Sequence, residues 1–166
     1  MCAPFLIKGV SLAENGIFLD HVAILVRDFE EALSRFKVLL SLSDDDIIVV
    51  KGFEDRDDLL DVAFLNVGNA WIEILSPVKP DGPMAKALEK RGEGLHHVCF
   101  SVKDLEAELK RISDAGFELI DKEPRVDRYG VPYFYVHPRS TCKALVSFIE
   151  RWRKTGKDSW RPQPKR

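Results

Sequence analysis

Residues Leu95–Glu106 read LHHVCFSVKDLE, and residues Leu19–Glu30, 76 positions earlier, read LDHVAILVRDFE. Leucine, histidine, two valines, a basic residue, aspartate, an apolar residue and glutamate follow in the same order in both stretches. The agreement continues at the same offset, since Arg35 matches Arg111. Coincidences this numerous, without a gap, indicate an internal duplication of the chain.

Each copy predicts a strand, a short turn and a helix. Ile17–Val26 alternates and then becomes continuously apolar, as a strand buried on at least one face does. Asp28 is placed to cap the following helix, whose first turn is acidic and whose apolar residues recur in helical steps. In the second copy the strand Leu95–Val102 leads to a helix at about 104–115, which Gly116 ends.

Further strands complete both halves. Three strands are predicted after each helix: Ile47–Val50, Val62–Leu65 and Ala70–Leu75, then Glu118–Asp121, Pro132–Val136 and Ala144–Ile149. Gly52–Asp58 is expected to be a charged loop, and Pro77–Pro83 a linker. A short helix is predicted from Pro83 to Gly92. Each half is therefore a β-α-β-β-β module, which makes the predicted fold α+β.

One domain with an extension at each end is expected from the length of 166 residues. We divide the chain into a leader (1–16), a single domain (17–150) and a tail (151–166). The domain comprises module one (17–77), a linker with the short helix (78–94) and module two (95–150). The tail holds seven basic residues and one acidic residue, and it is expected to be a loosely ordered extension.

The composition excludes several classes of protein. Its 45% hydrophobic and 31% charged residues are typical of a soluble globular chain, and a net charge of −2 does not favour nucleic-acid binding. No stretch approaches the roughly 20 apolar residues of a membrane span, and no signal peptide is evident. Cys2, Cys99 and Cys142 fit no metal-binding spacing, so reduced thiols are expected. We expect a cytoplasmic protein without nucleic-acid or membrane partners.

The duplication also pairs two further positions. Aligned as the last strands of their modules, Trp71–Leu75 and Leu145–Ile149 place Glu73 opposite Ser147. Glu73 lies between two isoleucines, and a buried carboxylate needs a partner.

A single histidine in a strand is more often a hydrogen-bonded structural residue than a ligand. The repeated position of His21 and His97, together with Glu73, instead predicts a divalent-metal site with open positions. His96 should point to the opposite face of its strand, as a structural or supporting residue.

These residues carry a family resemblance. The chain from Leu19 to Ile149 resembles the vicinal oxygen chelate superfamily of glyoxalases, bleomycin resistance proteins and dioxygenases, and within it the methylmalonyl-CoA epimerases. The motifs concerned are Leu19–Ala23, Val62–Leu65, Val67-Gly68, Ile72–Leu75, Leu88–His97, Asp121–Pro124 and His137–Ser140. The resemblance implies two βαβββ modules paired into a curved mixed sheet around a metal cleft. It also implies that His21, Glu73 and His97 hold a divalent ion (Co, Mn, Zn, Ni or Fe).

The sequence departs from the family at one ligand position. The family's fourth ligand is a glutamate in the last strand, where this chain has Ser147. A serine hydroxyl cannot act as a charged ligand or as a base near neutral pH. Glu150, three residues further on, faces the other way unless a bulge intervenes.

The resemblance implies an enzyme that stabilises an enolate during proton transfer next to a carbonyl. A cation polarises the carbonyl oxygen and a carboxylate moves the proton. Glu73 is the first candidate for a catalytic carboxylate, and Asp61, at the start of a core strand, is the second, although it could equally be the solvated end of an acidic run. The substrate is expected to be a small molecule, an acyl-CoA thioester being compatible with the basic tail and with Lys122, Arg125, Arg128, Arg139 and Lys143.

Two alternative functions remain open. Two histidines and one carboxylate suit a non-heme Fe(II) oxygenase, although the family's dioxygenases take their carboxylate from the last strand. A non-catalytic small-molecule-binding protein would keep the cleft without the chemistry. Whether two chains form a homodimer is not decided by the sequence.

Overall fold

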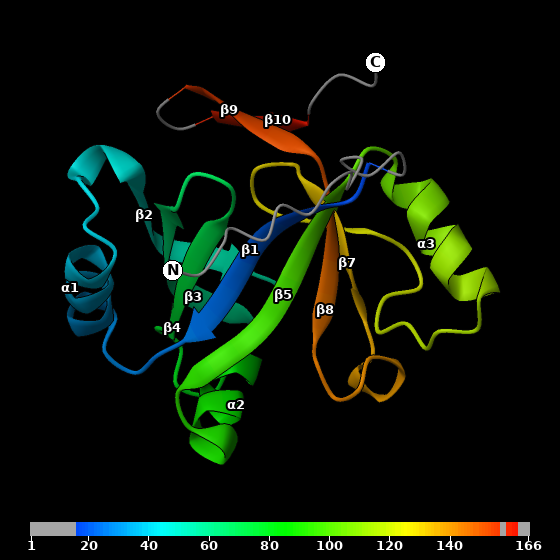
Figure 1. The fold of residues 1–166 in the computed structure, drawn as a ribbon. Coiled ribbons are helices and arrows are strands. Elements are labelled where there is room, and N and C mark those ends of the chain that lie inside the picture. Colours follow the sequence, from blue (N-terminus) through cyan, green and yellow to red (C-terminus); the bar gives the residue numbers. More distant parts are fainter. Residues whose placement is uncertain (1–15, 157–158, 163–166) are drawn as a thin grey trace, which may run out of the picture.

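The computed structural model describes residues 16–156 and 159–162 of the chain (Figure 1). Nearly all of the expected leader therefore lies outside the described residues. The elements are β1 (Phe18–Leu25), α1 (Phe29–Leu39), β2 (Ile47–Asp55), β3 (Asp58–Asn66), β4 (Trp71–Pro77), α2 (Pro83–Arg91), β5 (Gly94–Val102), α3 (Leu105–Asp114), β6 (Arg125–Val126), β7 (Pro132–Val136), β8 (Val146–Glu150), β9 (Trp152–Gly156) and β10 (Ser159–Pro162), with 3-10 turns at Asp44–Asp46 and Pro138–Ser140.

Eight strands form one curved mixed sheet in the order β2-β3-β4-β1-β5-β8-β7-β6. The order is symmetric about the β1–β5 pair, because β4, β3 and β2 follow β1 on one side as their counterparts β8, β7 and β6 follow β5 on the other. β1 and β4 are parallel, as are β5 and β8, while the antiparallel pair β1–β5 joins the modules. The predicted α+β fold of two βαβββ modules is confirmed.

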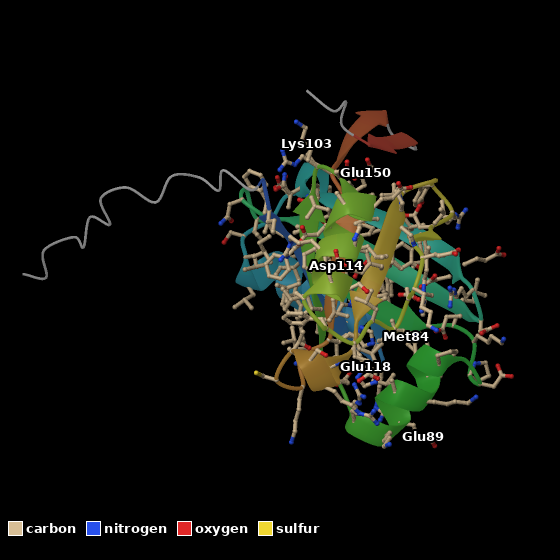
Figure 2. All side chains as sticks on the ribbon, turned by 90° about the vertical axis from the view of Figure 1, so that its right-hand side faces the viewer. Met84, Glu89, Lys103, Asp114, Glu118 and Glu150 are labelled. Carbon is tan, nitrogen blue, oxygen red and sulfur yellow. The ribbon has the colours of Figure 1, made fainter. Side chains whose placement is uncertain are left out.

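The two long helices cover the convex face of the sheet. α1 packs Phe29 against Leu65 and Ile74 in module one, and α3 packs Ile112 in a cluster with Phe134 in module two. Figure 2 shows α3 in front of its strands, between the labelled Lys103 and Asp114. Because strand side chains alternate, the neighbouring residues of the same strands face the concave side, where α2 covers one end.

Both long helices begin as the duplicated sequence predicts. The Asp28 side chain accepts a hydrogen bond from the Glu31 amide at 2.9 Å, and the Asp104 side chain accepts one from the Ala107 amide at 3.1 Å. Each aspartate thus satisfies one of the free N–H groups in the first turn of its helix. These caps fix where each chain segment leaves the sheet after the strand that carries a site histidine.

Two bulges in the β1–β5 pair re-aim the side chains at the centre of the sheet. The pairing is regular around Val22↔Val98, but it shifts between Leu19 and His21 on β1 and again opposite Leu95 and His97 on β5. Asp20 and His96 are therefore the additional residues of the two bulges. They are equivalent in the duplication, so the irregularities are symmetric, and each lies directly before a site histidine.

Two sequence predictions fail locally within the sheet. Gly52–Asp58 is not a loop, since β2 continues to Asp55 and only a tight turn at Arg56 separates it from β3; Gly52, at φ +63°, takes up the register shift. The expected strand Glu118–Asp121 is reduced to an isolated Leu119↔Val136 bridge, because the Asp121 side chain accepts the Tyr135 amide in place of a backbone partner.

The tail also differs from its prediction, since its described residues form the β9–β10 hairpin rather than a loose extension. Among the described helices none is long and apolar enough to cross a membrane.

Replacing Phe134 by Ala should test the module-two core. Phe134 is fully buried and stacks on Phe148 with ring centroids 5.2 Å apart. Its loss should lower the free energy of unfolding by about 3–5 kcal/mol in denaturant titrations, because the sheet and α3 cannot collapse into the cavity. Val126→Ala, at a position that is 65% exposed, is the control and should change stability by less than about 0.5 kcal/mol.

Candidate metal centre

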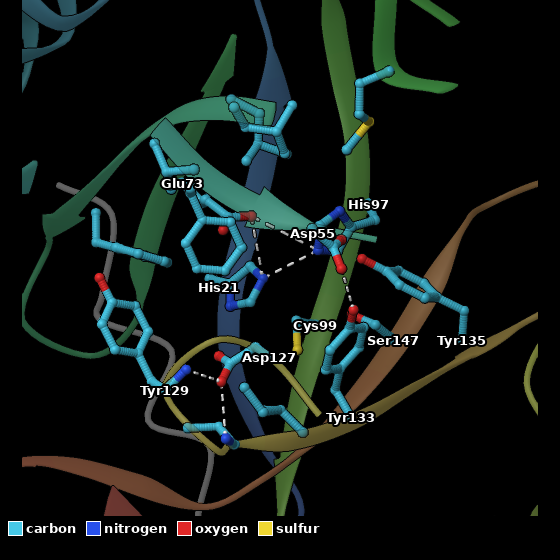
Figure 3. Close-up of a pocket in the computed structure, with 18 residues that line it drawn as sticks. His21, Asp55, Glu73, His97, Cys99, Asp127, Tyr129, Tyr133, Tyr135 and Ser147 are labelled. Carbon is cyan, nitrogen blue, oxygen red and sulfur yellow. Dashed lines mark hydrogen bonds and ion pairs between the residues drawn. The ribbon is translucent and has the colours of Figure 1, made fainter. Parts of the chain in front are cut away.

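Three side chains from three strands converge on one point. His21 on β1, Glu73 on β4 and His97 on β5 are all buried. The His21 Nε2 lies 3.1 Å from the His97 Nε2 and 3.4 Å from the Glu73 Oε2, and the latter two atoms are 3.8 Å apart. Figure 3 shows the three groups pointing toward one another. All three residues predicted from the sequence as metal ligands are thus brought together.

The sheet register explains this convergence. Ala23 on β1 is the pairing partner of Glu73 on one side and of His97 on the other. Residues directly opposite each other in a sheet point to the same face, and His21 is two residues from Ala23 on the same strand. The three larger side chains therefore surround a fully buried methyl group, which leaves room between them.

The two bulge residues support the histidines from behind. The Asp20 Oδ1 lies 2.9 Å from the His21 Nδ1, and the His96 Nδ1 lies 2.9 Å from the His97 Nδ1. Because of the bulge, the His96 ring lies in edge-to-face contact with the His97 ring and does not point to the opposite face of the strand. The predicted orientation of His96 is therefore wrong. Its expected supporting role agrees with this contact. Both Nε2 atoms remain directed at the convergence point.

Burial and neighbouring groups shift the pKa values of the two histidines in opposite directions. Burial disfavours a charged His21, but Cys99, Glu73 and Asp20 together raise its pKa well above the ordinary value. Burial, with His21 and His96 nearby, holds the pKa of His97 well below its ordinary value. Burial also raises the pKa of Glu73, against the opposing effect of His21. The cluster thus favours positive charge at its centre, which a proton on His21 or a bound cation can supply.

The donor set fits a divalent transition metal. Imidazole and carboxylate donors suit Zn, Mn, Fe, Co and Ni. Bonds of about 2.1 Å place neighbouring ligand atoms about 3.0 Å apart in an octahedral site and about 3.4 Å apart in a tetrahedral one. The observed separations of 3.1, 3.4 and 3.8 Å need little adjustment to either arrangement. Three protein donors would leave at least one position open to a substrate or water.

A pocket on the concave face opens beside these three side chains. Its wall is mostly apolar or aromatic, with Cys99, Ser147 and two further carboxylates: the lining comprises His21, Phe53, Asp55, Leu60, Val62, Phe64, Glu73, Leu75, Met84, His97, Cys99, Asp127, Tyr129, Val131, Tyr133, Tyr135, Ser147 and Ile149. No lysine or arginine is among these described lining residues. Its empty space is about 840 Å³, counted with the open mouth.

Contacts between the modules narrow the pocket mouth. The Arg128 guanidinium donates to the Gly52 carbonyl at 3.0 Å and lies over the Phe53 and Tyr129 rings. On the same side the Tyr133 hydroxyl donates to the Asp55 Oδ1 at 2.6 Å. These links connect the β2–β3 hairpin to the segment before β7, so the curved sheet is nearly closed around the pocket.

Several pocket residues were missed by sequence reasoning. Asp55 was assigned to a charged loop, and the tyrosines of β7 were read only as strand residues. Asp127 lies near the predicted strands, but its carboxylate accepts the amides of Tyr129 and Val131, both at 2.8 Å, and so shapes the loop. The alternation of β7 could have placed Tyr133 and Tyr135 on one face. Nothing local indicated that this face meets module one.

Asp61, the second catalytic candidate, does not reach the pocket. Its carboxylate accepts from the Lys51 Nζ at 3.0 Å and from the Gly52 amide at 3.1 Å. The adjacent Leu60 and Val62 line the pocket, so Asp61 faces the helix-covered side of β3. The assignment of Asp61 as a site carboxylate is therefore corrected, and Asp55 is the carboxylate that β2 places in the pocket.

Metal-binding measurements on two adjacent histidines should separate ligand from support. His97→Ala should abolish tight binding of Co(II) in a chelator-competition assay, because it removes one of three donors. His96→Ala should weaken binding roughly 10–100-fold, the usual effect of removing the group that orients a ligand. Leu95→Ala, at an exposed position of the same strand, is the control and should leave binding unchanged. Equal losses for both histidines would contradict this division of roles.

Comparisons with known proteins agree with the fold. The family model of the glyoxalase/bleomycin resistance protein/dioxygenase superfamily matches residues 20–135. The ethylmalonyl-CoA/methylmalonyl-CoA epimerase of Cereibacter sphaeroides is 32% identical over 130 residues, covering 77% of this chain and 93% of that protein. The uncharacterized protein YqjC of Bacillus subtilis is 33% identical over 132 residues, covering 80% and 91%. The crystal structure of methylmalonyl-CoA epimerase from Mycobacterium tuberculosis is similar with a TM-score of 0.72 and 27% identity, covering 93% and 94%. The chain therefore belongs to the glyoxalase/bleomycin resistance protein/dioxygenase superfamily.

Proposed function

We propose that this protein is a metal-dependent isomerase that moves a proton at the carbon next to the carbonyl of a 2-carboxyacyl-CoA thioester. The observation that carries the proposal is the convergence of His21, Glu73 and His97 at the wall of a pocket that also contains a separate carboxylate, Asp55. Relatives named as epimerases of ethylmalonyl-CoA and methylmalonyl-CoA support this reaction class and this type of substrate.

The three converging donors would hold a divalent cation, which supplies a Lewis acid that lowers the cost of forming an enolate. The chain's own residues orient and enclose the reacting group. Asp20 and His96 fix the two imidazole rings through their Nδ1 atoms. Phe53 and Phe64 belong to the apolar wall that keeps water from the reacting carbon.

Asp55 is the group that we assign to proton transfer. Its Oδ1 accepts the Tyr133 hydroxyl, and burial with Asp55 alongside raises the pKa of Tyr133, so the phenol stays protonated and continues to donate. This hydrogen bond fixes the direction of the carboxylate while its other oxygen can exchange a proton with a substrate carbon. Glu73, the first candidate from the sequence, remains our candidate for the second carboxylate of a two-sided transfer.

The coenzyme portion of the bound thioester would extend out of the pocket through its mouth. Arg128 lies there, over the Phe53 and Tyr129 rings. Arg125, by contrast, is paired with Asp121 and so is less suited to a phosphate. We assign the first contact with an anionic coenzyme chain to Arg128, because a guanidinium at a pocket entrance can exchange its carbonyl partner for a phosphate oxygen.

One observation favours a second candidate. A centre of two histidines and one carboxylate has the donor set of non-heme Fe(II) oxygenases. Anaerobic loading with Fe(II) followed by oxygen uptake with candidate substrates tests this alternative directly. Failure of the protein to bind any divalent metal would instead favour a binding protein without chemistry.

Deuterium exchange provides the decisive test of the isomerase. With Co(II) or Mn(II) bound, the protein should exchange the α-proton of methylmalonyl-CoA with solvent deuterium, as followed by NMR. Asp55→Asn, which still accepts from Tyr133, should slow exchange roughly 100-fold or more because it removes the proton acceptor.

The matched control for this test is Asp61→Asn, which alters a carboxylate on the opposite face of the sheet and should keep exchange within about twofold of the unaltered protein. Absence of exchange with metal bound would exclude the proposed substrate. The reverse order of effects, with Asp61→Asn the slower protein, would overturn the role of Asp55.

A further inference from the structure

The hydroxyl of Ser147 is a buried hydrogen-bond donor for which the described residues provide no acceptor in hydrogen-bond geometry. Ser147 is 3% exposed and belongs to the pocket wall. Among the described residues, its Oγ is the buried side-chain polar atom that lacks a hydrogen-bond partner, with only the weakly interacting Cys99 thiol beside it. Buried hydroxyls are normally satisfied, so one left unpaired at a pocket wall points to a partner that arrives with a ligand.

The sheet register aims this hydroxyl at the metal centre. Ser147 on β8 pairs with Cys99 on β5, and Cys99 is two residues from His97 on the same face. Glu73 pairs with Ala23 on β1, and Ala23 is the duplicated counterpart of Cys99. Ser147 therefore occupies, in module two, the position that Glu73 occupies in module one, as the alignment of the last strands predicted. Figure 3 shows it on the pocket wall between Cys99 and Tyr135.

The chemistry of serine differs from that of a carboxylate at this position. A glutamate there would add a second negative ligand and would occupy a coordination position. Serine adds no charge, so a divalent ion held by His21, His97 and Glu73 keeps a net positive charge and an additional open position. The hydroxyl can also donate a hydrogen bond, which an ionised carboxylate cannot do.

We propose that Ser147 is an anion-binding residue, whose hydroxyl donates to an anionic oxygen held in the pocket beside the three ligand atoms. The ligand class is a small oxygen anion that binds at the open position beside the three donors. This role rests on the proposed metal-dependent function, and it makes Ser147 a specificity-determining residue. A donor aimed at developing negative charge stabilises that charge strongly in a pocket shielded from water.

The test uses acetohydroxamate, a bidentate oxygen chelator, with the Co(II)-loaded full-length protein. Co(II) affinity is measured by chelator competition, and acetohydroxamate affinity by titrating the visible absorption of the bound Co(II). Ser147→Ala should change the Co(II) dissociation constant by less than about threefold and raise that of acetohydroxamate about 10-fold or more, the range expected for a hydrogen bond to a charged group. Ser147→Thr, which retains the hydroxyl, should restore most of the affinity.

Two further variants complete the design. Ser147→Glu should tighten Co(II) binding and also weaken acetohydroxamate binding, since a fourth ligand would occupy the open position. Ser101→Ala removes another buried serine that is outside the pocket lining, and it should alter neither constant.

The outcomes distinguish the anion-binding role of Ser147 from the proposed metal-dependent function. Normal Co(II) binding with unchanged acetohydroxamate affinity in Ser147→Ala would overturn the anion-binding role and leave the proposed function standing. Failure of the unaltered protein to bind Co(II) would overturn both.

Discussion

The antiparallel pairing of β1 with β5 is the constraint on which the rest of the structure depends. Among the described strands, it is the one pairing that joins the two modules into a continuous sheet, and its register brings the Nε2 atoms of His21 and His97 to 3.1 Å. The bulges at Asp20 and His96 are part of this register. Without them, each histidine would lose the neighbour that fixes its ring, and the two imidazoles would no longer be held in a defined orientation.

The same pairing buries three polar side chains that need a compensating charge or hydrogen-bond partner. Two imidazoles and the Glu73 carboxylate are buried together against Ala23, so each is largely removed from bulk water. The opposed pKa directions of His21 and His97 indicate that the two rings do not both carry a proton at the same time. A divalent ion satisfies all three donors at once, whereas a proton satisfies them unequally.

Much of this arrangement could be predicted from the sequence because it is repeated in the sequence. The duplication supplied the modules, both helix caps and the equivalence of Glu73 with Ser147. What could not be predicted depends on contacts between distant segments. A bulge such as that at His96 is visible only when the partner strand is known, and the pairing of Asp55 with Tyr133 is visible only when β7 is known to lie across the pocket from β2. Asp61 was misplaced because one residue of alternation decides which face a strand side chain occupies.

The charge of the pocket wall bears on the sequence of events in a binding cycle. Asp55, Glu73 and Asp127 line the pocket, no described lining residue is a lysine or arginine, and a proton on His21 would offset only one of the three carboxylates. An anionic molecule that entered ahead of the cation would meet net repulsion, while the cation itself would be drawn inward. Loading should accordingly be ordered, with the ion as the leading reactant and the organic anion following it. Excess chelator would then prevent the organic anion from binding because it removes the metal ion, although the chelator does not occupy the site of the organic anion.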